Sequence, residues 1–203
     1  GDLYVALPGE HAHGASFAGQ AVARGAIAVL TDAVGAALAT GLGVPVIVDA
    51  DPRAVMGELA SRVYGRPSTR MEMFGITGTN GKTSTVFLLE AALGALGRRV
   101  ATIGTIGFRL GDEELVSARG TVTTPESPDL QALLAVFVQR GAEAALLEVS
   151  SHALALSRVD GISFDVAGFL NLGRDHLDFH RDLDDYFEAK ARLFEPGRAA
   201  TSV

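Results

Sequence analysis

A glycine-rich segment that holds one of only two lysines is the strongest sign of chemistry in this sequence. The segment Gly75-Ile-Thr-Gly-Thr-Asn-Gly-Lys-Thr-Ser84 follows an apolar run and precedes a helical pattern. Backbone N–H groups at such a junction can surround an anion at the N-terminus of the helix. We predict that Gly78 and Gly81 let the backbone approach phosphate groups. Lys82 would then reach the outer phosphates, and the Thr83 hydroxyl would bind Mg²⁺.

The choice of lysine supports this interpretation. The chain has 17 Lys+Arg residues, of which only Lys82 and Lys190 are lysine. In a chain that otherwise uses arginine, a retained lysine indicates a need for a compact point charge or a reactive amine. The spacing departs from the common phosphate-binding pattern, which has glycine where this chain has Ile76. The alternative is an ordinary glycine-rich turn.

A single carboxylate, Glu148, lies near the end of the apolar run 144–149. Ligands of open parallel sheets gather outside the carboxyl ends of the strands. A carboxylate at that position can hold the Mg²⁺ of a bound nucleotide. The alternative is a strand-end glutamate that simply reaches water.

Two histidines and two aspartates follow the next predicted strand. They lie within residues 169–180 and include Asp175, His176 and His180. Imidazole and carboxylate groups at this spacing can bind or orient a divalent cation. A solvated polar loop is the alternative interpretation.

Lys190 lies on the apolar face of a predicted helix. The other members of that face are aromatic or aliphatic: Tyr186, Phe187, Leu193 and Phe194. Such a lysine either extends its ammonium group into water or has a functional role. Burial would lower its pKa and make a neutral amine available for reaction.

Short apolar runs alternate with helical patterns, which predicts an α/β fold with a mostly parallel sheet. The expected strands cover residues 3–6, 27–30, 44–48, 71–77, 100–103, 144–149 and 166–169. The expected helices cover residues 16–24, 52–64, 83–96, 128–140 and 184–194. Residues 65–68 are the best candidate for a linker, and 199–203 read as the start of another strand.

Composition narrows the functional class. Of the 203 residues, 48% are hydrophobic and 20% are charged, as in a globular protein of one or two domains. The net charge of −7 argues against a nucleic-acid partner. No apolar run is long enough to span a membrane, and the absence of cysteine fits a cytoplasmic protein. We expect a monomer, and both ends of the sequence suggest a fragment of a longer protein.

Four motifs in this order resemble the Mur ligases, the ATP-dependent amide-forming ligases of bacterial cell-wall precursor synthesis. They are Gly78-Thr-Asn-Gly-Lys-Thr83, Glu148-Val-Ser-Ser-His-Ala-Leu154, Asn171-Leu-Gly-Arg-Asp-His-Leu-Asp178 and Tyr186-Phe-Glu-Ala-Lys190. The resemblance implies a small N-terminal UDP-binding α/β domain over residues 1–66. A P-loop-type ATPase domain would follow over residues 67–203, with a C-terminal ligase domain absent from this chain.

The resemblance also implies roles for individual residues. ATP would be bound by Gly78, Thr79, Asn80, Gly81, Lys82, Thr83, Ser84 and Asn171. One Mg²⁺ would be held by Thr83 and Glu148, and a second by His176 and by Lys190 after CO₂ has converted its amine to a carbamate. Lys82, Glu148, His176 and Lys190 would be the catalytic residues.

The implied reaction activates UDP-N-acetylmuramoyl-L-Ala-D-Glu as an acyl phosphate and joins it to a diamino acid, either meso-diaminopimelate or L-lysine. The muramoyl-dipeptide would contact Thr123, Thr124, Ser150 and Arg158. The uracil ring would lie near Glu10, His11 and Ala12. The chain departs from the family in this loop, because His13 stands where the family usually has aspartate.

Three alternatives remain open at the level of sequence. One is another ligase of the superfamily, either a sister enzyme or one similar to folylpolyglutamate synthetase. Another is a P-loop NTPase that acts as a switch or motor, which leaves Lys190 and the segment around His176 unexplained. The third is a nucleotide-binding pseudoenzyme.

Overall fold

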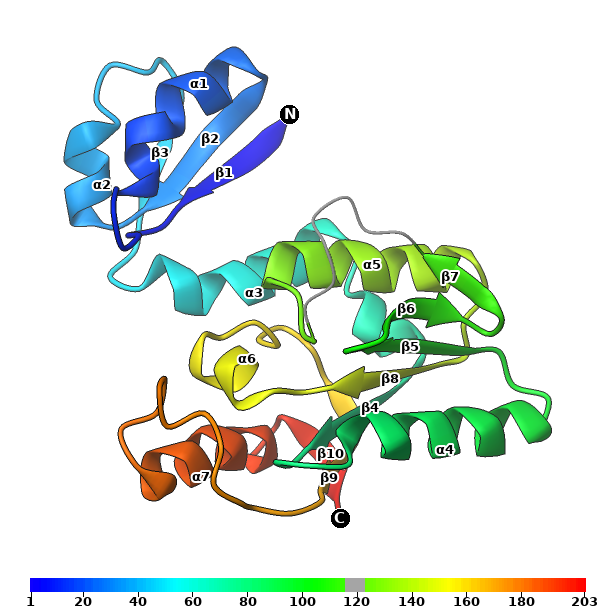
Figure 1. The fold of residues 1–203 in the computed structure, drawn as a ribbon. Coiled ribbons are helices and arrows are strands. Elements are labelled where there is room, and N and C mark those ends of the chain that lie inside the picture. The colour runs from blue at the N-terminus through cyan, green and yellow to red at the C-terminus, as the bar shows by residue number, and fades with distance from the viewer. Residues whose placement is uncertain (116–122) are drawn as a thin grey trace. The chain divides into compact units, whose positions relative to one another are not determined.

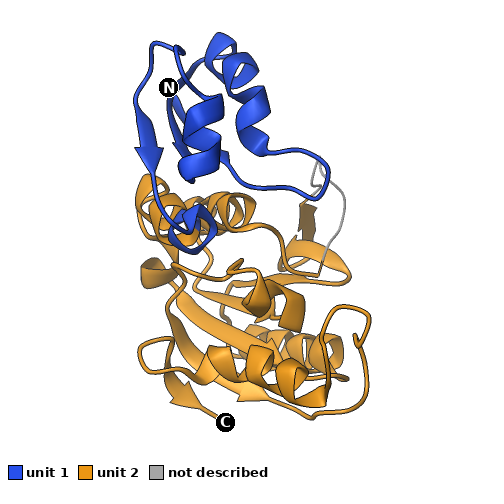
Figure 2. Cartoon of the chain, turned by 90° about the vertical axis from the view of Figure 1, so that its left-hand side faces the viewer, with its two compact units in different colours: residues 1–56 blue, residues 57–203 orange. Residues whose placement is uncertain are grey.

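The computed structural model describes residues 1–115 and 123–203 and divides the chain into two compact units, residues 1–56 and 57–203 (Figure 2). The division falls inside α3 (Pro52–Val63), the helix that leads from one unit into the other (Figure 1). Within the described residues, no helix has the length and hydrophobicity needed to span a bilayer.

The first unit is a three-stranded parallel sheet in the order β1-β2-β3. Its strands are β1 (Asp2–Ala6), β2 (Ala26–Thr31) and β3 (Val46–Val48), and its short helices are α1 (Ala18–Ala23) and α2 (Ala33–Leu38). A 3₁₀ turn, Gly14–Phe17, precedes α1. Small residues dominate the core, because Ala6, Ala15, Ala18 and Ala39 pack around Val29.

The second unit contains a seven-stranded sheet in the order β10-β9-β4-β8-β5-β6-β7. The first five strands in that order are parallel to one another: β10 (Ala199–Ser202), β9 (Phe164–Phe169), β4 (Glu72–Thr77), β8 (Ala144–Glu148) and β5 (Val100–Gly104). The antiparallel edge is formed by β6 (Gly107–Leu110) and β7 (Glu113–Leu115). The expectation of an α/β fold with a mostly parallel sheet is confirmed.

Helices cover both faces of this sheet, which explains why its central strands are apolar throughout. Leu146 of β8 packs against α4 (Lys82–Ala95) on one face. Its neighbours Ala145 and Leu147 point to the opposite face, which is covered by α5 (Ser127–Gln139) and α6 (Ser151–Ala155). The last helix, α7 (Leu183–Ala191), carries the second lysine.

Several elements differ from the sequence-based expectation. The helices α2 and α6 and the hairpin β6–β7 were not predicted, because segments of three to six residues are too short to show a clear period. The α-helical part of the expected helix 184–194 ends at Ala191, and a 3₁₀ turn over Arg192–Phe194 follows it. A 3₁₀ turn over Pro67–Arg70 also occupies part of the expected linker.

Candidate active site

The glycine-rich turn joins the carboxyl end of β4 to the first residue of α4. Gly78 and Gly81 have φ values of 150° and 88°, a backbone region that side chains with a Cβ rarely adopt. A Cβ at Gly78 would lie 3.0 Å from the Cβ of Leu170. Glycine is therefore required here both by conformation and by space, and the turn leaves the N-terminus of α4 open to an anion.

Lys82 is the first residue of α4, and its side chain folds back over the turn. Its Nζ donates hydrogen bonds to the carbonyl oxygens of Gly78 at 2.7 Å and Thr79 at 3.1 Å. Burial lowers the pKa of Lys82, while Glu148 and Asp175 act in the opposite direction. The ammonium group thus lies beside the helix N-terminus, where phosphate oxygens would gather.

Asn171 binds the backbone of the glycine-rich turn through its side chain and its carbonyl group. Its Oδ1 accepts from the backbone N–H of Asn80 at 2.9 Å, and its Nδ2 donates to the carbonyl of Asn80 at 3.0 Å. The Thr79 N–H donates to the Asn171 carbonyl at 3.0 Å. Ser84 is exposed in the first turn of α4. The structure therefore gathers the residues that the sequence assigned to ATP, although their contacts with a nucleotide stay a prediction.

Glu148 ends β8 with a side chain that is only 2% exposed. Its Oε2 accepts from the Thr83 hydroxyl at 2.9 Å and from the Thr105 hydroxyl at 3.2 Å. Its Oε1 accepts from the Thr105 N–H at 3.0 Å. Space for the carboxylate comes from Gly104, because a Cβ there would lie 2.1 Å from Oε1. Glu148 therefore does not simply reach water.

The oxygen atoms of Thr83 and Glu148 fit the demands of Mg²⁺. This cation prefers carboxylate and hydroxyl oxygens and keeps several waters and phosphate oxygens in its shell. A buried carboxylate that contacts a hydroxyl at the N-terminus of a phosphate-binding helix supplies that donor set. The metal role of this pair stays a prediction.

Lys190 is 1% exposed, which rules out an ammonium group extended into water. Its Nζ donates to the Gly78 carbonyl at 3.0 Å, the same oxygen that Lys82 contacts. It also lies 4.5 Å from the centre of the Tyr186 ring. Burial, followed by the nearby charge of Lys82, lowers the pKa of Lys190 to about 8, against a smaller opposing effect of Asp175. A substantial fraction of this amine is therefore neutral near pH 8, as a reactive lysine requires.

His176 reaches the same region from the segment between β9 and α7. Its ring lies 4.8 Å from the His152 ring and 6.1 Å from the Tyr186 ring, so it shares a neighbour with Lys190. Its φ of 53° is uncommon for a residue other than glycine. In the described part of the chain, no group of three or more His, Cys, Asp or Glu side chains is arranged to hold a metal ion. A metal role for His176 thus requires further ligands, such as a modified Lys190 or phosphate oxygens.

The four residues assigned to the muramoyl-dipeptide lie together beside Glu148. The Thr124 hydroxyl donates to the Glu148 carbonyl at 2.8 Å and accepts from the Ser150 N–H at 3.3 Å. The Thr123 hydroxyl lies 3.2 Å from that of Thr105. Arg158 donates from Nη1 to the Thr124 carbonyl at 3.3 Å. These polar groups border the carboxyl end of β8, and their contact with the muramoyl-dipeptide stays a prediction.

Glu10, His11 and Ala12 form an exposed loop of the first unit, at the carboxyl end of β1. A Cβ at Gly9 would lie 2.7 Å from the Ala12 carbonyl, so the loop is a tight turn. Its assignment to the uracil ring stays a prediction.

Sequence reasoning missed two residues of this site. Tyr186 was assigned only to an apolar helical face, but its hydroxyl also lies 3.2 Å from the Thr79 hydroxyl in the glycine-rich turn. Thr105 was not singled out, although it contributes two hydrogen bonds to Glu148. The spacing of four residues between Tyr186 and Lys190 was the available signal for the first. Thr105 follows a strand end, which alone does not identify its partner.

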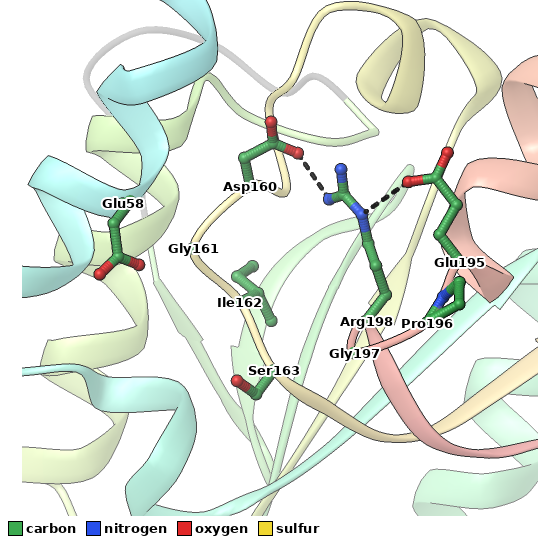
Figure 3. A pocket seen from close by; sticks show the side chains of 9 residues that line it. All are labelled: Glu58, Asp160, Gly161, Ile162, Ser163, Glu195, Pro196, Gly197 and Arg198. Atoms are coloured by element: carbon green, nitrogen blue, oxygen red, sulfur yellow. Dashed lines mark hydrogen bonds and ion pairs between the residues drawn. The ribbon is translucent and has the colours of Figure 1, made fainter.

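A separate pocket of about 350 Å³ lies at the amino ends of β9 and β10 (Figure 3). In it, Arg198 forms ion pairs with Asp160 at 2.5 Å and with Glu195 at 3.7 Å. The glycine-rich turn and Glu148 stand instead at the carboxyl ends of the strands, where parallel sheets bind ligands. The pocket in Figure 3 is therefore not the candidate active site.

Comparison with known proteins relates the chain to the Mur ligases. Residues 76–202 match the Mur ligase middle domain, and residues 1–64 match the Mur ligase family catalytic domain. The chain is 53% identical over its full 203 residues to a Streptomyces avermitilis protein named UDP-N-acetylmuramoyl-L-alanyl-D-glutamate--2,6-diaminopimelate ligase, and spans 39% of that protein.

Two solved structures are also similar. One, the structure of a UDP-N-acetylmuramoyl-L-alanyl-D-glutamate--2,6-diaminopimelate ligase, matches with a TM-score of 0.83 and 32% identity, over 100% of this chain and 40% of that one. The other, Escherichia coli FolC in complex with DHPP and ADP, matches with a TM-score of 0.52 and 27% identity, over 67% of this chain and 38% of that one. The chain thus spans about two fifths of the length of these relatives.

Proposed function

Because the chain belongs to the Mur ligase family, we propose that it is the UDP-binding and ATP-binding part of a ligase that adds a diamino acid to UDP-N-acetylmuramoyl-L-Ala-D-Glu. The observation that carries this proposal is the convergence of Lys82 and Lys190 on the Gly78 carbonyl, next to the contact between Thr83 and the buried Glu148. A simple nucleotide switch has no need for a second buried lysine. The relative named for 2,6-diaminopimelate favours that amino acid as the substrate.

ATP would lie with its phosphates at the N-terminus of α4. The ADP in the similar FolC structure supports an adenine nucleotide. Lys82 would leave the carbonyls of Gly78 and Thr79 and bind the phosphate oxygens, which are stronger acceptors for an ammonium group. Thr83 and Glu148 would hold Mg²⁺, which neutralises charge on the phosphate oxygens when it is bound.

The carboxylate of the D-glutamyl residue would attack the γ-phosphorus of ATP, giving an acyl phosphate and ADP. Thr124, Ser150 and Arg158 would hold the peptide so that this oxygen lies in line with the departing ADP. The amine of the diamino acid would then attack the acyl carbon and release phosphate. Activation is needed because a carboxylate oxygen is too poor a leaving group for direct amide formation.

Lys190 would take part as a carbamate. Its neutral amine would add to CO₂ and lose a proton, so that a buried cation becomes an anion able to bind a second Mg²⁺ together with His176. The lowered pKa of Lys190, about 8, supports this step, since the nucleophile is the unprotonated amine. Both Lys190 and His176 lie beside the Tyr186 ring, which supports the proposal that they bind the same metal ion.

The test is turnover by the protein extended to its natural ends. Phosphate release would be measured with ATP, Mg²⁺ and UDP-N-acetylmuramoyl-L-Ala-D-Glu, comparing meso-diaminopimelate with L-lysine. We expect turnover that depends on one of the two and is lost in Lys82→Met. ATP binding without turnover on either amino acid would contradict the proposal and favour a sister ligase or a pseudoenzyme.

A further inference from the structure

The loop over residues 7–14 of the first unit is fixed at its base but open at its tip. At the base, the Gly14 N–H donates to the Leu7 carbonyl at 2.8 Å, and the Tyr4 hydroxyl donates to the Gly14 carbonyl at 2.9 Å. A Cβ at Gly14 would lie 3.0 Å from the Leu7 backbone. The tip, with Glu10 and His11, is exposed.

His13 connects this base to a second element. Its Nδ1 accepts from the Ala15 N–H at 3.0 Å and so caps the turn Gly14–Phe17. Because a backbone N–H can only donate, the hydrogen-bond pattern places the ring proton on Nε2. That Nε2–H can then donate to Asp32 Oδ1, which lies 3.1 Å away.

Asp32 is itself fixed. It caps α2 by accepting a hydrogen bond from the Gly35 N–H at 2.7 Å. This bond lowers the pKa of the Asp32 carboxyl group; partial burial acts in the opposite direction, and His13 lowers the pKa further. Gly35 has no room for a side chain, because a Cβ would lie 1.9 Å from Thr31 Oγ1 and 2.5 Å from His13 Cε1. The His13 ring therefore fits closely between the loop and the first turn of α2.

An aspartate at position 13 could cap Ala15 equally well but would place a second carboxylate against Asp32. Histidine avoids this repulsion and adds a bond that an aspartate could not donate. The His13–Asp32 pair consequently connects the loop over residues 7–14, the turn Gly14–Phe17 and helix α2. The side chains of His13 and Asp32 are only 12% and 22% exposed.

We propose that His13 and Asp32 are positioning residues that hold the exposed loop in the conformation that binds the uridine diphosphate part of the substrate. The inference rests on the proposed function, which assigns Glu10, His11 and Ala12 to the uracil ring. Neither His13 nor Asp32 needs to touch the nucleotide. Their effect is to lower the conformational entropy that binding must otherwise remove from the loop.

The experiment measures steady-state kinetics of the protein extended to its natural ends. In His13→Ala and Asp32→Ala, we expect KM for UDP-N-acetylmuramoyl-L-Ala-D-Glu to rise roughly tenfold, the change that corresponds to about 1.4 kcal/mol. The kcat and the KM for ATP should stay within about twofold of wild type. The double variant should be no worse than either single variant, because both remove the same connection.

Two further variants separate positioning from simple stability. Asp32→Asn keeps an oxygen that accepts from Gly35 and from His13, so it should restore a KM near that of wild type. Asp51→Ala is the matched control, because Asp51 caps the start of α3 by accepting from the Arg53 and Ala54 N–H groups at 3.2 Å and 3.1 Å. It should lower the melting temperature without changing that KM.

Calorimetric titration of each variant with UDP distinguishes failure of the loop-positioning role from failure of the proposed function. Wild-type turnover with an unchanged KM in His13→Ala would overturn the inference and leave the proposed function standing. Absence of wild-type turnover, with UDP binding weakened about tenfold in His13→Ala, would support the inference and remove the proposed function. A wild-type protein that binds no UDP would overturn both.

Discussion

Replacing Gly104 with alanine tests whether the Glu148 carboxylate must occupy its observed place. An alanine Cβ at position 104 would lie 2.1 Å from Glu148 Oε1, 2.6 Å from Cδ and 2.8 Å from Cγ, all well inside van der Waals contact. Because Gly104 and Glu148 are both buried, the carboxylate has to leave its site. It then loses its bonds from Thr83 and Thr105.

The magnitude follows from these bonds. A hydrogen bond to a charged group contributes about 1.5 kcal/mol or more, so losing two of the three costs at least about 3 kcal/mol. If the same bonds position Glu148 for Mg²⁺, this loss corresponds to a fall of roughly a hundredfold in kcat/KM. We expect this fall in ATP-dependent phosphate release by the extended protein, together with a lower melting temperature.

The matched control is Gly94→Ala in α4, where the added Cβ would have no atom within 4 Å apart from the adjoining residues and the backbone of its own helix. Alanine is the better helix former by about 1 kcal/mol, so this variant should be slightly more stable and fully active. Wild-type kcat/KM and melting temperature in Gly104→Ala would refute the required position of Glu148, because the carboxylate would then have an equivalent place elsewhere.

The remaining predictions concern the helix that carries the second lysine. Lys190→Arg should abolish phosphate release because a guanidinium group cannot form a carbamate; wild-type turnover in this variant would contradict the role of Lys190. The pKa of Lys190 is about 8 in the folded protein and 10.5 in the unfolded chain, so between these pH values the unfolded chain binds more protons and wild-type stability rises with pH. In denaturant titrations without CO₂, the stability of Lys190→Met relative to wild type should therefore fall from pH 8 to pH 10.5, and parallel curves would exclude a lowered pKa of Lys190 in the folded protein. Tyr186→Phe removes the hydroxyl 3.2 Å from Thr79 Oγ1 but keeps the ring beside Lys190, so KM for ATP should rise several-fold and stability fall by about 1 kcal/mol. Unchanged ATP kinetics in that variant would limit Tyr186 to a packing role.

The motifs alone predicted the family and the main fold. The family resemblance drawn from four motifs is confirmed, as is the mostly parallel sheet. Both signals are local: apolar runs repeat along the chain, and the glycine-rich turn with Lys82 occupies consecutive residues. The lysine at position 190 was also visible, because its four-residue spacing from Tyr186 places both on one helical face.

Only the tertiary structure decided which of these groups meet. Gly78 and Lys190 are 112 residues apart in the chain, yet one carbonyl accepts from both lysines. No local pattern indicates that Gly104 makes room for Glu148, or that His13 reaches Asp32. Parallel strands bring distant segments side by side through crossover helices, so the partners at their carboxyl ends are set by strand order and register. Strand order is a property of the packed sheet as a whole, and the residue types along the chain do not encode it locally.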